Sequence, residues 1–481
     1  MKISLIEPCS PDYHVYSMLA IPRLGLPLLG TVLSRQGHEV KVYVEDLQAI
    51  GSAEALEILQ SDLVGISATS STAPRGYAMA RLLRLRGIPV VFGGVHPTFM
   101  PEEPLRYADY VITGQAEQTL PALVDALEDG GDLDAVPNLL YNRDEDVART
   151  AEEPQSMELD EMPIPDYSLI EGRDQMNIMP VVTTRGCPHN CTFCCVSPMF
   201  GHCYRMKSVD RVVEELRRIG KQHVFFCDDN FTASRTRAKE LLGEMLRQEV
   251  YPSRWYAQVR ADTYKDDELL ELMRRTNCQR VFVGFESVSQ RVLDSYHKHQ
   301  SMADLQRCAE VFHDHDIAVH GMFMFGADED DKTVFGETVN FAIEHGIDTV
   351  QFLILTPVPG SELFNQLEEQ GRIFTRDWTL YDGHHVVFEP ARMSPLELQL
   401  ETLRANRRFY SMRSVLRSLS CLRMSTAMLR YLGRRVLRGW RKANRRFIQT
   451  LRNWQDGRQS FPERFSVQRL QADLPMFRGS G

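Results

Sequence analysis

The chain has 481 residues, of which 43% are hydrophobic and 25% are charged, and its formal net charge is −10. This composition excludes a disordered or fibrous protein and, at this length, indicates two to four globular domains. No apolar run approaches the ~20 residues that a membrane-spanning helix needs. The first residues fit a buried strand and not a signal peptide, so we expect a cytoplasmic protein. In that compartment ten cysteines point to metal or redox chemistry and not to disulfides.

Residues 1–140 alternate short β-branched segments with helical patterns. We predict strands at 2–6, 39–44, 63–67, 89–92 and 110–113, and helices at 25–36, 76–86 and 117–128. This alternation is typical of a doubly wound parallel sheet, which binds ligands at the carboxyl ends of its strands. The loops expected there, 68–75, 93–98 and 114–117, are rich in small and hydroxyl residues. They would let a large flat ligand approach the backbone.

The chain after this α/β domain divides into three further parts. Residues 141–176 carry many acids and several prolines, and we interpret them as an interdomain linker. Residues 177–390 repeat the strand–helix pattern, with strands predicted at 178–183, 223–227, 255–259, 280–285, 319–325 and 349–355. Six such units predict a partial (β/α)6 barrel and not a complete eight-unit barrel. Residues 391–481 form a basic C-terminal region with helical patterns.

Three cysteines with C-x3-C-x2-C spacing, Cys187, Cys191 and Cys194, follow the first predicted barrel strand. Their thiolates can converge on one soft metal centre. One alternative is a structural zinc site, which needs a fourth protein ligand. The nearby candidates for that ligand are His189, Cys195, His202 and Cys203. The other alternative is a 4Fe–4S cluster, in which three cysteines leave one iron open for a substrate. The position at the catalytic end of the barrel favours the cluster.

This motif resembles that of the radical SAM superfamily, C-x3-C-x-aromatic-C, with Phe193 as the aromatic residue. The resemblance implies a 4Fe–4S cluster bound by Cys187, Cys191 and Cys194, whose open iron binds the amino and carboxylate groups of S-adenosylmethionine (SAM). It also implies an electron donor such as flavodoxin or ferredoxin. Cys195 lies outside the motif and is expected either to pack or to lie beside the substrate.

Further residues expected to bind SAM lie where the barrel strands end. The full set is Phe193, Asp228, Asp229, Asn230, Gly284, Glu286, Ser287 and Gly326. The superfamily usually places a carboxylate after the second strand to hold the ammonium group, and Asp228 and Asp229 lie there. A cap for the following helix is the alternative role for this segment. After the fourth strand, Gly284 permits close approach and Glu286 could accept the ribose hydroxyls.

The resemblance is closest to the cobalamin-dependent branch, in which a Rossmann-like domain precedes the barrel. That branch includes C-methyltransferases, hopanoid-modifying enzymes and the anaerobic cyclase of bacteriochlorophyll synthesis. The residues expected to bind cobalamin are Ser67, Thr69, Ser70, Gly93, Gly94, His96, Pro97, Thr98, Gly114, Gln115 and Glu117. His14, in the sequence D-x-H-x-x-S, is the candidate cobalt ligand, because many cobalamin domains have D-x-H-x-x-G. A scaffold domain with an empty pocket is the alternative.

Between Glu401 and Asp456 the sequence has no acidic residue and fifteen Lys or Arg. Because the net charge of the whole chain is −10, the rest of the chain carries a net charge of −25. Apolar residues recur there at helical spacing. We expect Gly433 and Gly439 to divide the segment into shorter helices. Three uses remain open: packing on the acidic body, peripheral contact of residues 402–455 with anionic lipid at the inner face of the membrane, or nucleic-acid binding. Nucleic acid is the least favoured.

These features predict a cobalamin-dependent radical SAM C-methyltransferase. The resemblance implies that a 5′-deoxyadenosyl radical takes hydrogen from an unactivated carbon, which then receives the methyl group of methylcobalamin. Oxidation, cyclisation or rearrangement is the alternative outcome, and a non-catalytic cobalamin or iron–sulfur sensor is an alternative of another class. The substrate is expected to be a small molecule such as a lipid, an isoprenoid, a tetrapyrrole or another natural product. A methylthiotransferase acting on transfer RNA is disfavoured, because Cys9 is the sole cysteine before residue 177.

Overall fold

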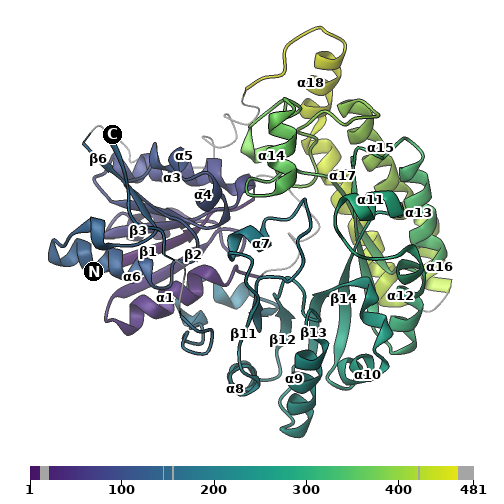
Figure 1. The fold of residues 1–481 in the computed structure, drawn as a ribbon, viewed down its shortest axis with the longest axis horizontal. Helices are drawn as coiled ribbons and strands as arrows, with labels where there is room; N and C mark the ends of the chain where they lie inside the picture. Colours follow the sequence, from purple (N-terminus) through teal and green to yellow (C-terminus); the bar gives the residue numbers. More distant parts are fainter. Residues whose placement is uncertain (11–20, 145, 154–156, 421–422, 464–481) are drawn as a thin grey trace.

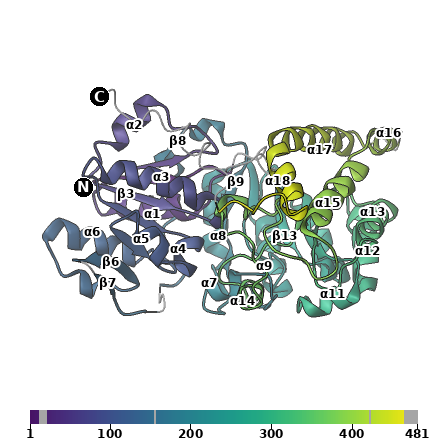
Figure 2. The same cartoon turned by 90° about the horizontal axis from the view of Figure 1, so that it is seen from above.

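The computed structural model describes residues 1–10, 21–144, 146–153, 157–420 and 423–463 (Figure 1). Two β-sheets lie side by side, and most of the C-terminal helices pack around the second sheet (Figures 1 and 2). His14, the predicted cobalt ligand, lies outside the described residues.

The first sheet has eight strands in the order β7-β6-β5-β4-β3-β1-β2-β8. Its parallel centre consists of β1 (Lys2–Glu7), β2 (Glu39–Val44), β3 (Leu63–Ser67), β4 (Val90–Gly93) and β5 (Tyr110–Ile112). One hydrophobic cluster joins the sheet to α1 (Gly25–Arg35) and α6 (Thr119–Asp129). Another joins it to α2 (Ser52–Ile58) and α3 (Ala73–Arg84). Helices therefore cover both faces of this sheet, which confirms the predicted doubly wound architecture.

The segment that we interpreted as a linker instead extends this sheet at both edges. β6 (Leu139–Arg143) and β7 (Asp146–Arg149) form an antiparallel hairpin beside β5. β8 (Ile170–Glu171) pairs with β2 at the other edge. Edge strands are short and polar on their open side, which protects them from pairing with other chains. Their composition therefore resembles that of a loop.

The second sheet contains six parallel strands in the order β16-β15-β14-β13-β12-β9. They are β9 (Met179–Val181), β12 (His223–Phe226), β13 (Arg254–Val259), β14 (Cys278–Glu286), β15 (Ala318–Phe325) and β16 (Thr349–Ile354). The longer helices between them are α8 (Val209–Ile219), α9 (Arg235–Arg247), α10 (Asp267–Arg275), α11 (Gln290–Ser295), α12 (Met302–Asp314) and α13 (Val334–Glu344). In the described part of the chain β9 and β16 do not pair, so the sheet is an open partial barrel, as predicted.

The C-terminal region is helical, as predicted, but it is divided differently. Its helices are α15 (Pro395–Phe409), α16 (Met412–Ser420), α17 (Met424–Ala443) and α18 (Arg445–Gln455), and α14 (Glu362–Glu369) precedes them. α17 continues through Gly433 and Gly439, so the prediction that these glycines break the helix is wrong. A Cβ at Gly433 would lie 2.8 Å from the ring of Tyr410, so this glycine permits close packing. None of the described helices is long and apolar enough to cross a membrane.

Candidate functional site

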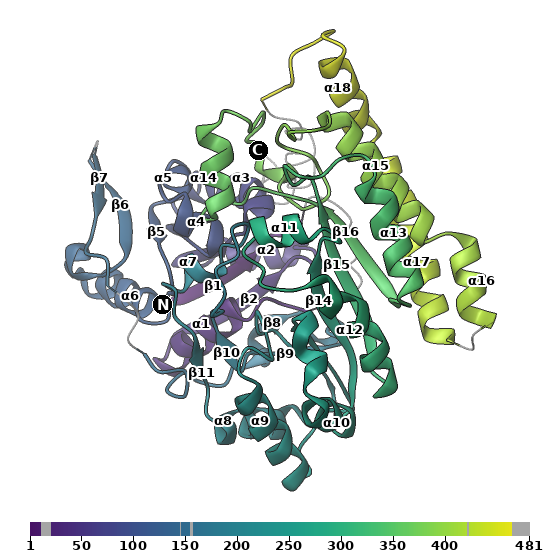
Figure 3. The same cartoon turned by 45° about the vertical axis from the view of Figure 1, so that its right-hand side comes forward.

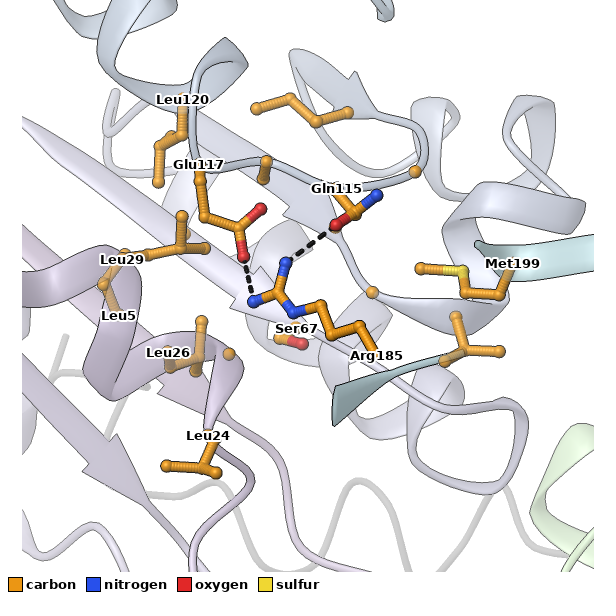
Figure 4. A pocket seen from close by; sticks show the side chains of 18 of the residues that line it. Leu5, Leu24, Leu26, Leu29, Ser67, Gln115, Glu117, Leu120, Arg185 and Met199 are labelled. Atoms are coloured by element: carbon orange, nitrogen blue, oxygen red, sulfur yellow. Dashed lines mark hydrogen bonds and ion pairs between the residues drawn. The ribbon is translucent and has the colours of Figure 1, made fainter. Parts of the chain in front are cut away.

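A pocket of 330 Å³ lies between the first domain and the start of the barrel (Figure 4). Its volume is at the lower end of the ~300 to 1,000 Å³ typical of small-molecule sites. Leu24, Leu26, Leu29 and Leu120 give the first-domain side an apolar wall. The barrel side contributes a smaller set of residues, Val182, Thr184, Arg185, Met199, Phe200, Cys227 and Asp229. The pocket thus combines an apolar recess in the first domain with polar side chains from both domains.

Six of the residues predicted to bind cobalamin line this pocket. They are Ser67, Gly93, Gly94, Gly114, Gln115 and Glu117. All lie at the carboxyl ends of β3, β4 and β5, where a doubly wound sheet binds its ligands. Gly94 has φ +99°, and a Cβ there would lie 2.9 Å from Ser67 Oγ. Glycine is therefore required where these two strand ends meet.

The other five predicted cobalamin residues lie outside the pocket lining: Thr69, Ser70, His96, Pro97 and Thr98. The His96 imidazole is fully buried, 3.2 Å from Ser70 Oγ and 3.0 Å from Tyr77 Oη. Its ring packs edge-on against the ring of Trp378 in the second domain, and the two ring centres are 4.9 Å apart. The Thr98 hydroxyl donates to a carbonyl after β4 and accepts from an amide after β5. These residues support the pocket loops and the domain contact.

Arg185 links the two domains across the pocket (Figure 4). It lies in β10 (Thr184–Arg185), two residues before Cys187. Its Nη1 donates to Gln115 Oε1 at 2.8 Å, and its Nη2 donates to Glu117 Oε1 at 2.5 Å. Arg205, in the paired strand β11 (Arg205–Met206), donates to the same Gln115 oxygen at 2.5 Å. Glu117 Oε2 is buried without a hydrogen-bond partner among the described residues, so it can accept one more bond.

The three cysteines of the motif lie half-buried in the loop between β10 and α7 (Val196–Met199). Burial raises the pKa of all three thiols, that of Cys194 to about 12. The charges of Lys298 and Arg260 oppose this effect at Cys187 and Cys191. Iron binding removes the thiol protons, so both cations would stabilise the metal-bound thiolates. The loop therefore suits an anionic cluster.

Within the described residues, no three His, Cys, Asp or Glu side chains lie close enough to hold one metal ion.

Glu286 and Lys298 form a buried ion pair beside this loop. Lys298 Nζ donates to Glu286 Oε1 at 2.6 Å, and the same Nζ lies 5.9 Å from the centre of the Phe193 ring. A Cβ on Gly284 would collide with the Glu286 carboxylate, so this glycine makes room for the pair. Glu286 has φ +62°, a conformation that costs about 1 to 3 kcal/mol and often occurs at functional sites. Three predicted SAM residues thus meet at one point.

The three polar residues after β12 have different environments. Asp228 is fully buried and accepts hydrogen bonds from Thr183 N and Oγ1, both at 2.6 Å, and from Thr184 N at 2.9 Å. Asp229 lines the pocket, and its burial together with the charge of Asp228 raises its pKa to about 6. Asn230 is buried, with Nδ2 unpaired among the described residues. Ser234, and none of these three, caps α9.

Comparison with known proteins gives the family of the chain. The model of the radical SAM superfamily matches residues 181–355, and that of the B12-binding domain matches residues 18–124. An uncharacterized methyltransferase of Pyrococcus horikoshii, PH0819, is 33% identical over 379 residues, which cover 75% of this chain and 81% of the relative. This chain belongs to the radical SAM superfamily. Its B12-binding domain places it in the cobalamin-dependent branch.

This radical SAM enzyme is similar to two further proteins. The bacteriochlorophyllide d C-12(1)-methyltransferase of Chlorobaculum tepidum is 29% identical over 73% of this chain and 75% of the relative. The radical SAM methyltransferase TsrM of Kitasatospora setae, solved with cobalamin and a [4Fe-4S] cluster, has a TM-score of 0.65. That match covers 77% of this chain and 75% of TsrM at 18% identity, and it confirms the fold. The cofactors of the enzyme are accordingly a 4Fe–4S cluster, SAM and cobalamin.

Two residues predicted to bind SAM, Gly326 and Ser287, make contacts within the protein that account for their side chains. Gly326 has φ +113°, and a Cβ there would lie 2.9 Å from Leu398 of α15. Its amide donates to Asp330 Oδ2 at 2.9 Å. The Ser287 hydroxyl accepts from the amide of Ser289 at 3.1 Å, which shapes the turn after β14.

Sequence reasoning missed three cations at this site, Arg185, Arg260 and Lys298. Arg260 follows β13 and donates from Nη2 to the carbonyl of His299 at 2.9 Å. Lys298 comes 12 residues after Glu286, beyond a short helix, and nothing in that spacing predicts their contact. The position of Arg185 just before the cysteine motif was visible, but its partners 68 and 70 residues earlier were not.

Proposed function

We propose that this enzyme transfers a methyl group to an unactivated carbon of a small molecule. One observation carries the proposal: a single pocket is lined by loops of the B12-binding domain and by Asp229 and Arg185 of the radical SAM domain. A methyl donor on one side and a radical source on the other would face the same space. The apolar lining would keep water away from both.

The residues at the site suggest distinct roles. Cys187, Cys191 and Cys194 are proposed to hold the cluster, while Asp229 and Glu286 are proposed to accept hydrogen bonds from SAM. When bound, the cluster and SAM supply a 5′-deoxyadenosyl radical, and cobalamin supplies the methyl group. Six of the first-domain residues that line the pocket are proposed to hold cobalamin. They are Ser67, Gly93, Gly94, Gly114, Gln115 and Glu117.

The proposed substrate is a bulky apolar metabolite, such as a tetrapyrrole or an isoprenoid lipid. The name of the Chlorobaculum relative indicates a tetrapyrrole substrate for that protein. The leucine-rich wall of the pocket suits apolar material, whether it belongs to a cofactor or a substrate. We further propose flavodoxin or ferredoxin as electron donor and a peripheral membrane contact through residues 402–455.

The test is an anaerobic reconstitution with iron, sulfide, hydroxocobalamin, SAM and a strong reductant, with products counted by mass spectrometry. Methyl transfer predicts both 5′-deoxyadenosine and methylcobalamin. Cys191→Ala should abolish the deoxyadenosine, whereas Cys203→Ala, which changes an exposed cysteine outside the motif, should not. Deoxyadenosine without bound cobalamin would contradict methyl transfer and favour oxidation, cyclisation or rearrangement. Neither product from protein with an intact cluster would favour the sensor.

A further inference from the structure

α16 and the first half of α17 form a helical hairpin that exposes apolar side chains. Among the described residues, seven of the eleven exposed large hydrophobic side chains lie in this hairpin. They are Met412, Leu416, Leu419, Met424, Met428, Leu429 and Tyr431. Single exposed apolar residues are normal, but a contiguous group marks an interaction surface.

Arginines gather beside the hairpin, and one of its exposed apolar side chains, Met412, lines a cavity together with them. This cavity of 750 Å³ lies among α13, α16 and α17. Five arginines line it, Arg408, Arg413, Arg417, Arg423 and Arg430, and so do the hydroxyls of Ser411, Ser414, Ser418 and Thr426. One acidic side chain, Glu344, is among the described residues of its lining. The cavity therefore has the donors and the excess positive charge that a phosphate group requires.

The positive charge of this cavity is only partly neutralised within the chain. The buried carboxylate of Asp348 lies 3.6 Å from Arg423 and also pairs with His313. Arg413 and Arg417 form no ion pair with any described residue. Burial and the charges of Arg423 and Arg417 lower the pKa of Arg430, although Asp348 opposes them. These arginines thus repel one another, and an external anion would relieve the repulsion.

The barrel-facing side of α17, which also contributes Thr426 and Arg430 to the cavity, is anchored to the barrel. Arg430 Nε and Nη2 donate to the carbonyls of Asp348 and Ile347, each at 2.8 Å. Thr426 Oγ1 donates to Asp348 Oδ1 at 3.1 Å. The buried face of α17 also includes Ala427 and Gly433. Because these bonds fix α17 to the barrel, its exposed apolar side chains face away from the core.

We propose that the α16–α17 hairpin docks the enzyme on an anionic lipid bilayer. Arg413 and Arg417 would lie among the phosphates, while Leu416, Met424 and Met428 enter the acyl boundary, as in interfacial amphipathic helices. Nucleic acid would use the charges but leave the apolar side chains in water. The inference rests on the proposed membrane contact of residues 402–455 and is independent of the reaction.

The hairpin lies at the end of the molecule remote from the first domain (Figures 2 and 3). Contact with a bilayer there leaves the pocket between the domains uncovered. The docking surface can therefore concentrate the enzyme where an apolar substrate is dissolved without blocking the B12-binding domain.

The test is flotation of the full-length protein with vesicles of phosphatidylcholine alone or with 30 mol% phosphatidylglycerol. The variant Leu416→Ser/Arg417→Gln changes the hairpin, and Leu85→Ser/Arg86→Gln changes another exposed Leu-Arg pair, on the first domain. We expect binding to the anionic vesicles, at least about fivefold weaker in the hairpin variant, because each arginine at a membrane surface contributes ~1 kcal/mol. The first-domain variant should bind like the unchanged protein.

Three outcomes would overturn the proposal. The hairpin variant could bind as well as the unchanged protein, the unchanged protein could bind neutral vesicles equally well, or it could bind neither. A second variant of the hairpin, Met428→Ser, should also bind the anionic vesicles more weakly. The thermal unfolding midpoint of each variant shows whether it is folded. If Arg435→Gln/Arg438→Gln loses vesicle binding while the hairpin variant keeps it, the proposed membrane contact of residues 402–455 is supported. The proposal that the hairpin makes this contact is then wrong. Deoxyadenosine formation without vesicles reports on the reaction alone.

Discussion

Two arginine-containing regions of this enzyme use the same side chain in opposite ways. At the domain interface, Arg185 and Arg205 are mostly buried and donate to Gln115, and Arg185 also pairs with Glu117. On the α16–α17 hairpin, Arg413 and Arg417 are exposed and have no acidic partner among the described residues. A buried guanidinium needs its partner inside the chain, because water cannot solvate it. An exposed one costs little, and it remains available to an anion outside.

The largest effect is expected at the cluster loop that Arg185 connects to the first domain. Cys191→Ala should abolish 5′-deoxyadenosine formation, because two thiolates do not hold the cluster. Iron content and deoxyadenosine yield after reconstitution measure this. An unchanged yield would show that the loop does not carry the radical chemistry.

The next effect tests whether the interface arginine is structural. Arg185→Met leaves the buried Glu117 carboxylate without its cation, and removing one partner of such a pair costs about 3 to 5 kcal/mol. The free energy of unfolding in urea measures the loss. Arg274→Met, which breaks an exposed pair with Glu271, should cost less than about 1 kcal/mol. Equal losses would remove the distinction between the two kinds of arginine.

A third test concerns how the C-terminal helices are held on the barrel. Burial would raise the pKa of Asp382, but His385 outweighs it by its charge and hydrogen bonding, with a contribution from His384, and the pKa falls to about 2. His385 Nε2 in turn lies 3.0 Å from Asn444 Oδ1, between α17 and α18. Because the folded-state pKa lies below the unfolded one, this stabilisation is present at neutral pH and disappears as the pH falls from about 4 through about 2.

Asp382→Asn should therefore lower the free energy of unfolding by about 2 kcal/mol at pH 7. The difference from the unchanged protein should shrink towards zero near pH 2. Urea unfolding across this pH range measures it. A difference that does not vary with pH would show that the Asp382 charge is not responsible.

The smallest effect is expected at the hairpin. Arg417→Gln should change the free energy of unfolding by no more than about 0.5 kcal/mol, because the side chain is exposed and unpaired. A loss comparable to that of Arg185→Met would mean that the hairpin arginines serve the fold and not an external anion.

Much of the fold was predictable from the sequence. The central strands of both sheets are buried on two faces, so their runs of β-branched residues stand out, and β2 and β3 have the predicted bounds. β7 and β8 were missed because short edge strands lack that pattern, and β6 was missed because only its first three residues are buried. Gly433 was misjudged because its reason is a contact with Tyr410, and helix propensity does not describe contacts.

The sequence by itself determined the two domain types, the cysteine motif and the uneven distribution of charge, because each depends on residues that are neighbours along the chain. Only the tertiary structure decided that Ser67 lines the pocket while His96 packs inside, that Asp228 is occupied by backbone amides while Asp229 faces the pocket, and that Lys298 meets Glu286. These pairings join residues that are distant in sequence. The folding of the sheets alone brings them within the few ångströms at which hydrogen bonds and ion pairs act.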